Sequence, residues 1–291
     1  MTAQLIADAL VRGSTIALLA VGLTLVYGTM RFANVAHMEF ATLGAYATVT
    51  MSSVFIVPVA AATGVLLAIA LGLASYQLVF RRLLAKGETS AMIGSLAVSI
   101  VVQAAVQLCY GTRPREIPRE LERATSILGA ELTPSQIRLV AVSLAALALT
   151  GALLRWTPLG KKVRAVAADP ALARVSGVAE RRVIAAVWAI AAGLAAVSGI
   201  ELALQSSATP ALGFGLLLPV FSAAIVGGLG SVAGAVIASY GVALVESIAL
   251  AADVDGVSVP VNYRPAIGFV FLILALVFRP QGLLGVRARH V

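Results

Sequence analysis

The chain has 291 residues, of which 60% are hydrophobic and 12% are charged, and its mean hydropathy is +1.00. A soluble domain carries about 25% charged residues, and the apolar residues here form blocks long enough to cross a bilayer, roughly 17 to 25 residues each. This composition excludes a soluble globular protein and predicts an all-α, polytopic helical integral membrane protein. The net charge of +8 does not indicate nucleic-acid binding, because the basic residues lie in short loops between apolar blocks.

The rarer residue types exclude further classes of protein. The single cysteine, Cys109, cannot form an internal disulfide or a cysteine-based metal cluster, and its apolar surroundings predict a small buried side chain. Because His37 and His290 are the two histidines and neither has a partner ligand in the sequence, no metal site or cofactor is expected. No basic residue precedes Arg12, so the amino-terminal segment lacks the basic region of a signal peptide.

Nine apolar segments are candidate membrane spans. The seventh is short and contains Pro219 and a glycine pair, so we expect a broken or re-entrant helix near 214–229, which lipid tolerates only where protein or a cavity surrounds it. We therefore expect about 8–9 transmembrane helices in a single transmembrane domain over 1–291. The segments are 9–28, 35–57, 60–80, 91–110, 137–156, 183–204, 214–229, 232–250 and 265–278.

The charges of the loops predict the orientation. Loop 81–90, the segment 157–183 and the C-terminus carry an excess of Lys and Arg, which places them in the cytoplasm by the positive-inside rule. Loop 111–136 balances four Arg against four Glu, and 252–262 is acidic, so both are expected outside. Nine crossings satisfy this pattern, with the N-terminus periplasmic and the C-terminus cytoplasmic.

The segment 157–183 is a compact basic island in an apolar chain. Thr157 and Asp169 each precede a proline, which is the pattern of an N-cap followed by proline at the first helical position, and Gly177 suits a helix C-cap. The island is therefore expected to form two short capped helices. It fits both an amphipathic element held by anionic lipid and a docking site for a cytoplasmic partner. The first helix has one apolar side: Leu159, Val163 and Val166.

Two other stretches are rich in small residues. On a helix, Asn34, His37 and Gly44 share a small polar face that suits close packing with hydrogen bonds across it, whereas Glu39 points to the other side. For His37, both a structural hydrogen bond and a role in gating remain open. The run 221–241 allows a tight reversal and close helix packing, and a place beside a pore is compatible with that. Its glycines include Gly227, Gly228, Gly230 and Gly234.

Few ionisable residues lie deep in the apolar segments. Glu201 and Glu246 are the candidates, and an intramembrane carboxylate is a functional candidate by default. No series of Asp, Glu or His side chains runs through the spans, as a proton-coupled carrier needs. No set of nucleophile, base and orienting group is present, so the chain is not predicted to be an enzyme.

Several stretches, in one order, resemble the H-type integral-membrane permease of branched-chain amino-acid ABC importers. They cover nearly the whole chain: GSTIALLAVGLTLVYG (13–28), NVAHMEFATLGAY (34–46), LGKKVRAVAADPALARVSGV (159–178), FSAAIVGGLGSVAGA (221–235) and RPQGLLG (279–285). The resemblance implies a subunit of the bacterial inner membrane that forms half of a translocation path for branched-chain amino acids. It also implies a second homologous permease subunit, two ATP-binding subunits and a periplasmic substrate-binding protein as partners.

The same resemblance implies roles for particular residues. It makes 157–183 a cytoplasmic coupling loop that meets the ATPases, with Arg164 as an ionic contact. The implied coupling residues are Gly160, Arg164, Ala165, Asp169, Pro170 and Gly177. The candidates for the translocation path or for helix packing are Asn34, His37, Gly44, Gly227, Gly228, Gly230, Gly234 and Glu246.

Other functions remain open at this point. Urea or short amides are alternative substrates within the same family. A self-sufficient secondary transporter would show inverted repeats and a buried coupling-ion site, neither of which the sequence indicates convincingly. A structural membrane subunit would transport nothing. Transport by the ABC permease needs ATP, transport by a secondary carrier needs an ion gradient, and a structural subunit transports nothing.

Overall fold

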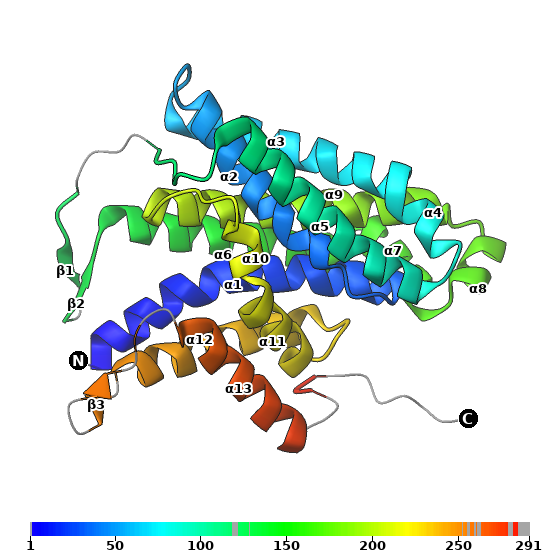
Figure 1. Ribbon diagram of the computed structural model, residues 1–291. Coiled ribbons are helices and arrows are strands. Elements are labelled where there is room, and N and C mark those ends of the chain that lie inside the picture. Colours follow the sequence, from blue (N-terminus) through cyan, green and yellow to red (C-terminus); the bar gives the residue numbers. More distant parts are fainter. Residues whose placement is uncertain are drawn as a thin grey trace.

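Long apolar helices lie side by side and form an elongated bundle (Figure 1). The computed structural model describes residues 2–117, 122–127, 129–251, 253–254, 257–258, 260, 263–278 and 282–284. The C-terminal basic residues Arg279, Arg287 and Arg289, and parts of loops 111–136 and 252–262, lie outside the described residues.

Six helices in the described part of the chain are long and apolar enough to cross a membrane. They are α1 (Thr2–Met30), the continuous segment Val57–Leu84, α5 (Glu88–Tyr110), α6 (Pro134–Trp156), α9 (Glu180–Gln205) and α12 (Val232–Ala251). The segment Val57–Leu84 contains α3 (Val57–Ser75), the π-helical turn η2 (Tyr76–Phe80) and α4 (Arg81–Leu84). Shorter helices are η1 (Val35–Met38), α2 (Glu39–Met51), α7 (Pro158–Ala168), α8 (Pro170–Val175), α10 (Leu212–Gly215), α11 (Leu217–Gly227) and α13 (Arg264–Phe278). The prediction of a polytopic helical membrane protein is confirmed.

Two small antiparallel ribbons were not expected from the sequence. Strand β1 (Thr125–Ile127) pairs with β2 (Ala130–Leu132), and β3 (Asp253–Val254) pairs with β4 (Val257–Ser258). The first ribbon reverses at Gly129, whose φ of 82° suits a residue without a Cβ. Both ribbons lie in connections between helices, so the bundle itself remains all-α.

Helices α1 and α9 form the centre of the bundle. Every residue of α1 from Gly13 to Val26 is buried, and the Ser198 hydroxyl of α9 donates a hydrogen bond to the Thr15 carbonyl of α1 (3.0 Å). Gly199 of α9 packs so closely on the Ala41 carbonyl of α2 that a Cβ would collide with it. Small residues therefore set the spacing of the central helices, as expected where lipid gives no hydrophobic drive for their association.

An aromatic cluster ties four segments together at one end of the bundle. The ring of Trp188 in α9 lies 4.9 Å from that of Phe80, 5.6 Å from that of Tyr76 and 6.2 Å from that of Phe40, measured between centroids. Its indole N–H also donates to the Met30 sulfur at the end of α1 (3.4 Å). The cluster fixes the ends of α1, α3 and α9 relative to the start of α2.

The basic loops gather at the same end as this cluster, where α7 and α8 also lie (Figure 1). Arg31, which follows α1, donates a hydrogen bond to the Ala167 carbonyl in α7 (3.2 Å) and so joins two of the basic segments directly. The opposite end holds the N-terminus and the β1–β2 ribbon. Described basic residues at the α7 end are Arg31, Arg81, Arg82, Lys86, Arg155, Lys161, Lys162, Arg164, Arg174, Arg181 and Arg182.

Three local predictions are wrong. Cys109 is exposed on α5 rather than buried, because the outer side of that helix has no protein neighbour among the described residues. Thr157 does not cap α7 with its side chain, since its hydroxyl instead donates to the Leu153 carbonyl one turn earlier (2.6 Å). Asn34 does not share an α-helical face with Gly44, because the backbone between them begins as a 3₁₀ helix.

We expect the alanine variants of two glycines to change stability in opposite directions. At Gly44 a Cβ would lie 2.7 Å from the Ala196 Cβ, so the α2–α9 contact must widen, at a cost of about 1–3 kcal/mol. At Gly241 a Cβ would meet no described atom within 4 Å, so Gly241→Ala should gain up to about 1 kcal/mol of helix propensity. Unfolding of the two variants in detergent micelles measures the difference, and equal stability would contradict this packing.

Candidate functional site

The second span is interrupted where it begins. Asn34 has an extended backbone, and η1 makes one 3₁₀ turn before α2 starts at Glu39. The Val35 N–H, which has no helical partner, donates to the Ser95 hydroxyl of α5 (3.0 Å). The Asn34 side chain is fully buried, yet neither its amide nitrogen nor its oxygen has a partner among the described residues. Uncommitted hydrogen-bonding groups therefore lie beside this interruption.

The seventh span is broken, as the sequence predicts. Helix α10 ends at Gly215, and α11 starts at Leu217. The Gly213 N–H at this break donates to the Thr42 hydroxyl of α2 (2.9 Å), and a Cβ at Gly213 would collide with the Met38 carbonyl. The two irregular segments thus pack directly on each other and are stabilised by side-chain hydroxyls.

A buried carboxylate connects these two segments with α5. Glu39 is completely buried, and its carboxylate accepts hydrogen bonds from Ser99 in α5 (2.8 Å) and Thr42 in α2 (3.0 Å). Thr42 accepts in turn from Gly213 in α10. Glu39 was not selected as a candidate from the sequence. The available signals were its place in an apolar segment and the spacing of Ser95 and Ser99, which puts both on one face of α5.

His37 and Gly44 contact different neighbours. The His37 ring is buried against α1, where Nε2 lies 3.1 Å from the Leu19 carbonyl oxygen and Gly22 leaves room for the ring. Gly44 packs on Ala196 of α9. His37 Nδ1 has no partner among the described residues. The structural hydrogen bond considered for His37 is made by Nε2, and it leaves Nδ1 without a described partner. The three residues Asn34, His37 and Gly44 are all buried within this chain.

The glycine-rich run makes the reversal from α11 to α12. Gly227 and Gly234 approach each other so closely that a Cβ on either would collide with backbone of the other helix. Gly228 and Gly230 both have a φ of 95°, a backbone conformation that residues with a Cβ rarely adopt. The described C-terminal residues 282–284 contact this turn, because the Leu283 N–H donates a hydrogen bond to the Val226 carbonyl (2.7 Å).

A cluster of buried charges lies near the end of the bundle that is opposite to α7 and α8. Glu246 of α12 is fully buried and pairs with Arg12 of α1, with 3.5 Å between the carboxylate oxygen and Nε. Arg264, at the start of α13, interacts electrostatically with both. The Arg12–Glu246 pair thus links α1 to α12, and α13 packs against the same carboxylate, since a Cβ at Gly268 would lie 3.0 Å from Glu246 Oε1.

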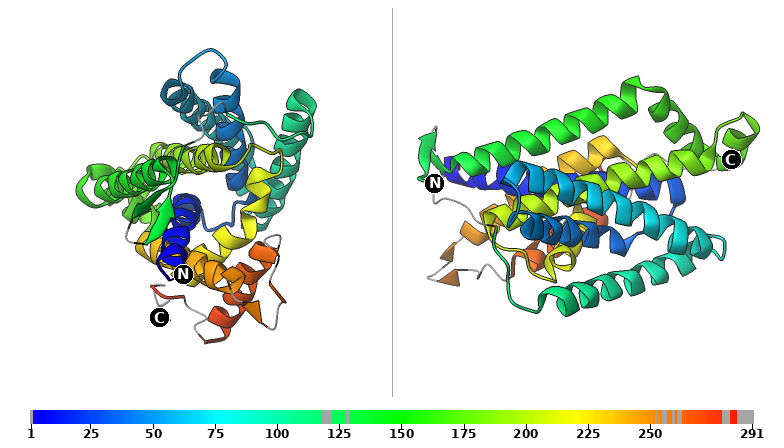
Figure 2. Two further views of the ribbon diagram at one scale, coloured as in Figure 1. Left: turned by 90° about the vertical axis from the view of Figure 1, so that its left-hand side faces the viewer. Right: turned by 90° about the horizontal axis from the view of Figure 1, so that it is seen from above.

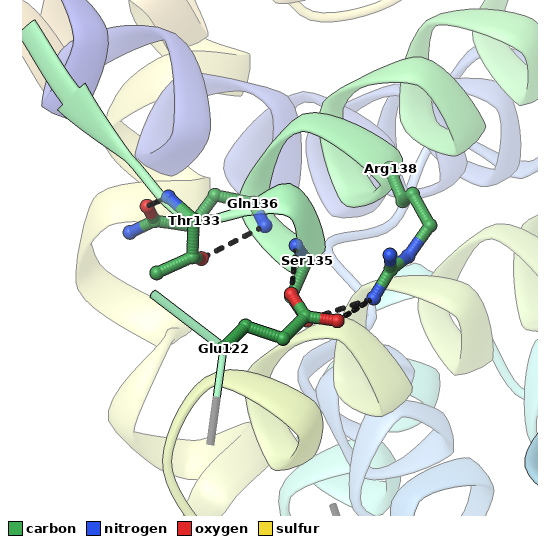
Figure 3. A network of polar contacts seen from close by, with 5 residues as sticks. All are labelled: Glu122, Thr133, Ser135, Gln136 and Arg138. Carbon is green, nitrogen blue, oxygen red and sulfur yellow. Dashed lines mark hydrogen bonds and ion pairs between the residues drawn. The ribbon is translucent and has the colours of Figure 1, made fainter. Parts of the chain in front are cut away.

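Glu201 of α9 lines a cavity of about 590 Å³ bounded by α3, α6 and α9. Its carboxylate accepts hydrogen bonds from Ser143 and from Thr15 (3.5 Å for Thr15). At the rim of the cavity, Glu122 accepts from the Ser135 N–H (2.7 Å), the Ser135 hydroxyl (2.8 Å) and Arg138 (Figure 3). The hydrogen bond from Arg138, followed by those from Ser135, holds the pKa of the Glu122 carboxyl below its ordinary value of 4.5.

Helices α7 and α8 form the predicted pair of short helices in the basic island. Asp169 caps α8 by accepting from the N–H groups of Ala171 (2.8 Å) and Leu172 (3.0 Å), and Pro170 occupies the first helical position. Gly177 ends α8 with a φ of 80°, as a C-cap glycine should. The island is therefore a defined structural element rather than a flexible linker.

Helices α7 and α8 differ in which side chains they bury and which they expose. Helix α7 packs on the bundle: Gly160 fits closely against the Leu154 carbonyl, and Ala165 is half-buried against the core. Arg164 also turns toward the bundle, where it donates to the same carbonyl (2.7 Å). Helix α8 instead exposes Leu172 (64%) and Val175 (87%). Leu172 and Val175 form the apolar tip of α8 and are the exposed large apolar side chains of this pair of helices.

Among the described residues, no group of three His, Cys, Asp or Glu side chains is arranged to hold a metal ion. The candidate sites are thus a buried polar network between interrupted helices and a projecting two-helix element. The bundle is that of a multi-helix membrane protein, and its fold is similar to those of two solved transporter structures. A solved structure described as a metal-chelate type ABC transporter in an inward-facing conformation matches this chain with a TM-score of 0.56 at 15% identity, covering 94% of this chain and 86% of the other. PsaBC from Streptococcus pneumoniae matches with a TM-score of 0.50 at 14% identity, covering 97% of both chains.

The chain belongs to the family described as branched-chain amino acid transport system / permease component, whose model matches residues 5–276. Its relatives include the high-affinity branched-chain amino acid transport system permease protein BraD of Pseudomonas aeruginosa, which is 31% identical over 97% of this chain and 95% of its own length. The permease proteins LivH of Escherichia coli K12 and Salmonella typhimurium are each 31% identical over 94% of this chain and 92% of theirs. The resemblance stated from the sequence is confirmed.

We expect Glu246→Leu to destabilise the protein by about 3 kcal/mol, because removing one partner of a buried ion pair leaves an uncompensated charge. Adding Arg12→Leu should recover part of this loss, since the double variant also removes the charge of Arg12 and leaves only that of Arg264 without Glu246. Unfolding in detergent micelles compares the two variants. A double variant that is less stable than Glu246→Leu would show that the pair does not link α1 to α12.

Proposed function

We propose that the chain is a non-catalytic permease subunit of an ABC importer that forms half of a translocation path for branched-chain amino acids. Family membership supports the class of transporter, and the relatives' names supply the substrate. The observation that carries the proposal is the α7–α8 element, since two short helices at the basic end, one packed on the bundle and one capped by Asp169, are suited to transmit motion. ATP hydrolysis then belongs to partner subunits.

The proposed orientation follows from the distribution of charge. The end that holds α7 and α8 is rich in Lys and Arg, so we place it in the cytoplasm of a bacterial inner membrane. The N-terminus and the β1–β2 ribbon then face the periplasm. In this arrangement two ATP-binding subunits meet the α7–α8 element, and a periplasmic substrate-binding protein meets the opposite end.

The proposed path runs beside the interrupted helices. Irregular backbone at membrane depth occurs where protein or a water-filled cavity covers it, and broken helices are where transporters place their substrate sites. The unpartnered Asn34 side chain and the Glu39 network lie at these interruptions. A second, homologous permease subunit would complete the path, and weak contacts suffice because the binding protein selects the substrate.

For coupling, α8 is the better candidate than Arg164. Leu172 and Val175 are exposed on α8, whereas the Arg164 guanidinium turns back toward the bundle, where one of its N–H groups donates to the Leu154 carbonyl. Asp169, Pro170 and Gly177 set the position of α8, and Gly160 and Ala165 seat α7 on the bundle. We therefore assign partner contact to the tip of α8 and structural support to the other coupling residues.

We expect leucine uptake into proteoliposomes that contain both permease subunits, the ATPases and the binding protein to require ATP. Leu172→Ser combined with Val175→Ser should abolish the stimulation of ATPase activity by loaded binding protein, because the apolar tip is lost. The matched control is Val101→Ser, an exposed apolar residue (66%) in the middle of α5 and away from both proposed docking ends.

Three results would each contradict part of this proposal. Uptake driven by an ion gradient without ATP would identify a secondary transporter instead. Full stimulation in the double variant, with normal insertion, would remove the coupling role from α8. Uptake of urea or a short amide, but not of leucine, would change the substrate and leave the coupling mechanism intact.

We expect cysteines at the two ends of the bundle to be labelled from opposite sides of the membrane. In a Cys109→Ala background, Ser126→Cys in β1 should react with an impermeant maleimide in cells whose outer membrane alone is permeabilised. Ser176→Cys, at the end of α8, should react only after the inner membrane is opened. Both positions are exposed, so the reverse pattern would invert the proposed orientation.

A further inference from the structure

The bundle has an apolar groove of about 780 Å³ on its surface. Its walls are α6 and α12, its floor is α1, and α7 closes one end. Helix α6 runs along the edge of the bundle in the view from above (Figure 2), so the groove faces the surroundings of the protein. Its lining is mostly aliphatic and includes Leu25, Leu147, Val236 and Ile237.

Two arginines stand at the α7 end of this groove. Arg155, in the last turn of α6, is exposed, and Arg164 of α7 uses one N–H group to bind the Leu154 carbonyl. A guanidinium has five N–H donors, so most of the hydrogen-bonding capacity of Arg164 is left for another acceptor. The described residues that line the groove include no Asp or Glu, and its polar end is therefore complementary to an anion.

A buried hydroxyl lies deeper in the same groove. Thr24 of α1 is 1% exposed and lines the groove, yet its hydroxyl has no hydrogen-bond partner among the described residues. It lies six residues before Met30, the end of α1, which corresponds to about 9 Å along the helix axis. The groove thus has a cationic end and an otherwise mostly aliphatic lining, in which the hydroxyl of Thr24 is buried and that of Thr29 donates to the Leu25 and Val26 carbonyls.

We propose that this groove binds a membrane phospholipid with an anionic headgroup. The phosphate accepts hydrogen bonds from Arg155 and Arg164, and an acyl chain lies between α6 and α12. Basic pockets between transmembrane helices on the cytoplasmic side are suited to such headgroups. Placement in the cytoplasmic leaflet depends on the proposed orientation, but binding of the lipid does not.

Comparison with a neighbouring groove supports the proposed preference for an anionic headgroup. Helices α3, α6 and α9 bound a second aliphatic groove of about 330 Å³, and no charged residue appears among its described lining residues. Apolar chains can cover both grooves, but only the first offers cations to a phosphate. Since α7 forms the end of the first groove, the bound lipid would also hold α7 against α6.

The test uses purified protein exchanged into nanodiscs of phosphatidylglycerol or of phosphatidylcholine with identical chains, followed by native mass spectrometry of retained lipid. Wild-type protein should retain phosphatidylglycerol preferentially. Arg155→Gln should weaken retention about fivefold, because one basic side chain near a phosphate is lost. The control is Arg82→Gln, an exposed basic residue at the same end that does not line the groove.

Two further variants separate lipid binding from misfolding. Gly151→Leu should displace the lipid without loss of stability, because a Cβ at Gly151 meets no described atom within 4 Å. Thr24→Val is a packing control: the hydroxyl is buried and has no partner to lose, so both lipid retention and the stability of the lipid-free protein should stay unchanged.

Three results would overturn the proposal. These are equal retention of the two lipids by wild-type protein, equal effects of Arg155→Gln and Arg82→Gln, and loss of the lipid preference when the second permease subunit is present. The last result would identify the groove as an interface between subunits. Because each readout is retained lipid, none depends on whether the chain transports amino acids.

Discussion

The constraint on which this structure depends is that backbone N–H and C=O groups in a bilayer must find partners within the protein. Two spans break their helices, at η1 and between α10 and α11. The amide of Val35 is satisfied by Ser95 and that of Gly213 by Thr42. These partners come from other helices, so the interruptions persist only in the assembled bundle. The Glu39 carboxylate, bound to Ser99 and Thr42, joins the two breaks into one polar unit.

Packing around α1 explains where such a unit can exist. Lipid provides no hydrophobic drive between helices, so close approach relies on small residues. Gly199 and Gly44 bring α9 against α2, and Gly227 and Gly234 bring α11 against α12. The outer helices α3, α5 and α6 keep many large aliphatic side chains exposed. Helices with small-residue contacts therefore bury the polar network, whereas the peripheral helices provide grooved surfaces that lipid chains can fill.

The proposed coupling and lipid sites meet at α7. One side of this helix packs on the bundle through Gly160 and Val163, and its end leads directly to the capped turn at Asp169. A force applied at the tip of α8 would reach α6 through the contact of Gly160 with the Leu154 carbonyl. A lipid held by Arg155 and Arg164 would lie beside that same contact, and so the membrane would support the element that receives the force.

The sequence by itself determined the features that depend on residues close together in the chain. The apolar segments follow from local hydropathy, the cap at Asp169 and the turn at Gly177 from local backbone chemistry, and the shared end of the basic loops from the alternation of spans. The tertiary structure alone decided which side chains meet across the bundle: the pairing of Arg12 with Glu246, the partners of Glu39, and the exposure of Cys109. Such contacts join residues far apart in the chain, and their geometry depends on helix rotation and spacing, which a single sequence does not encode in any local pattern.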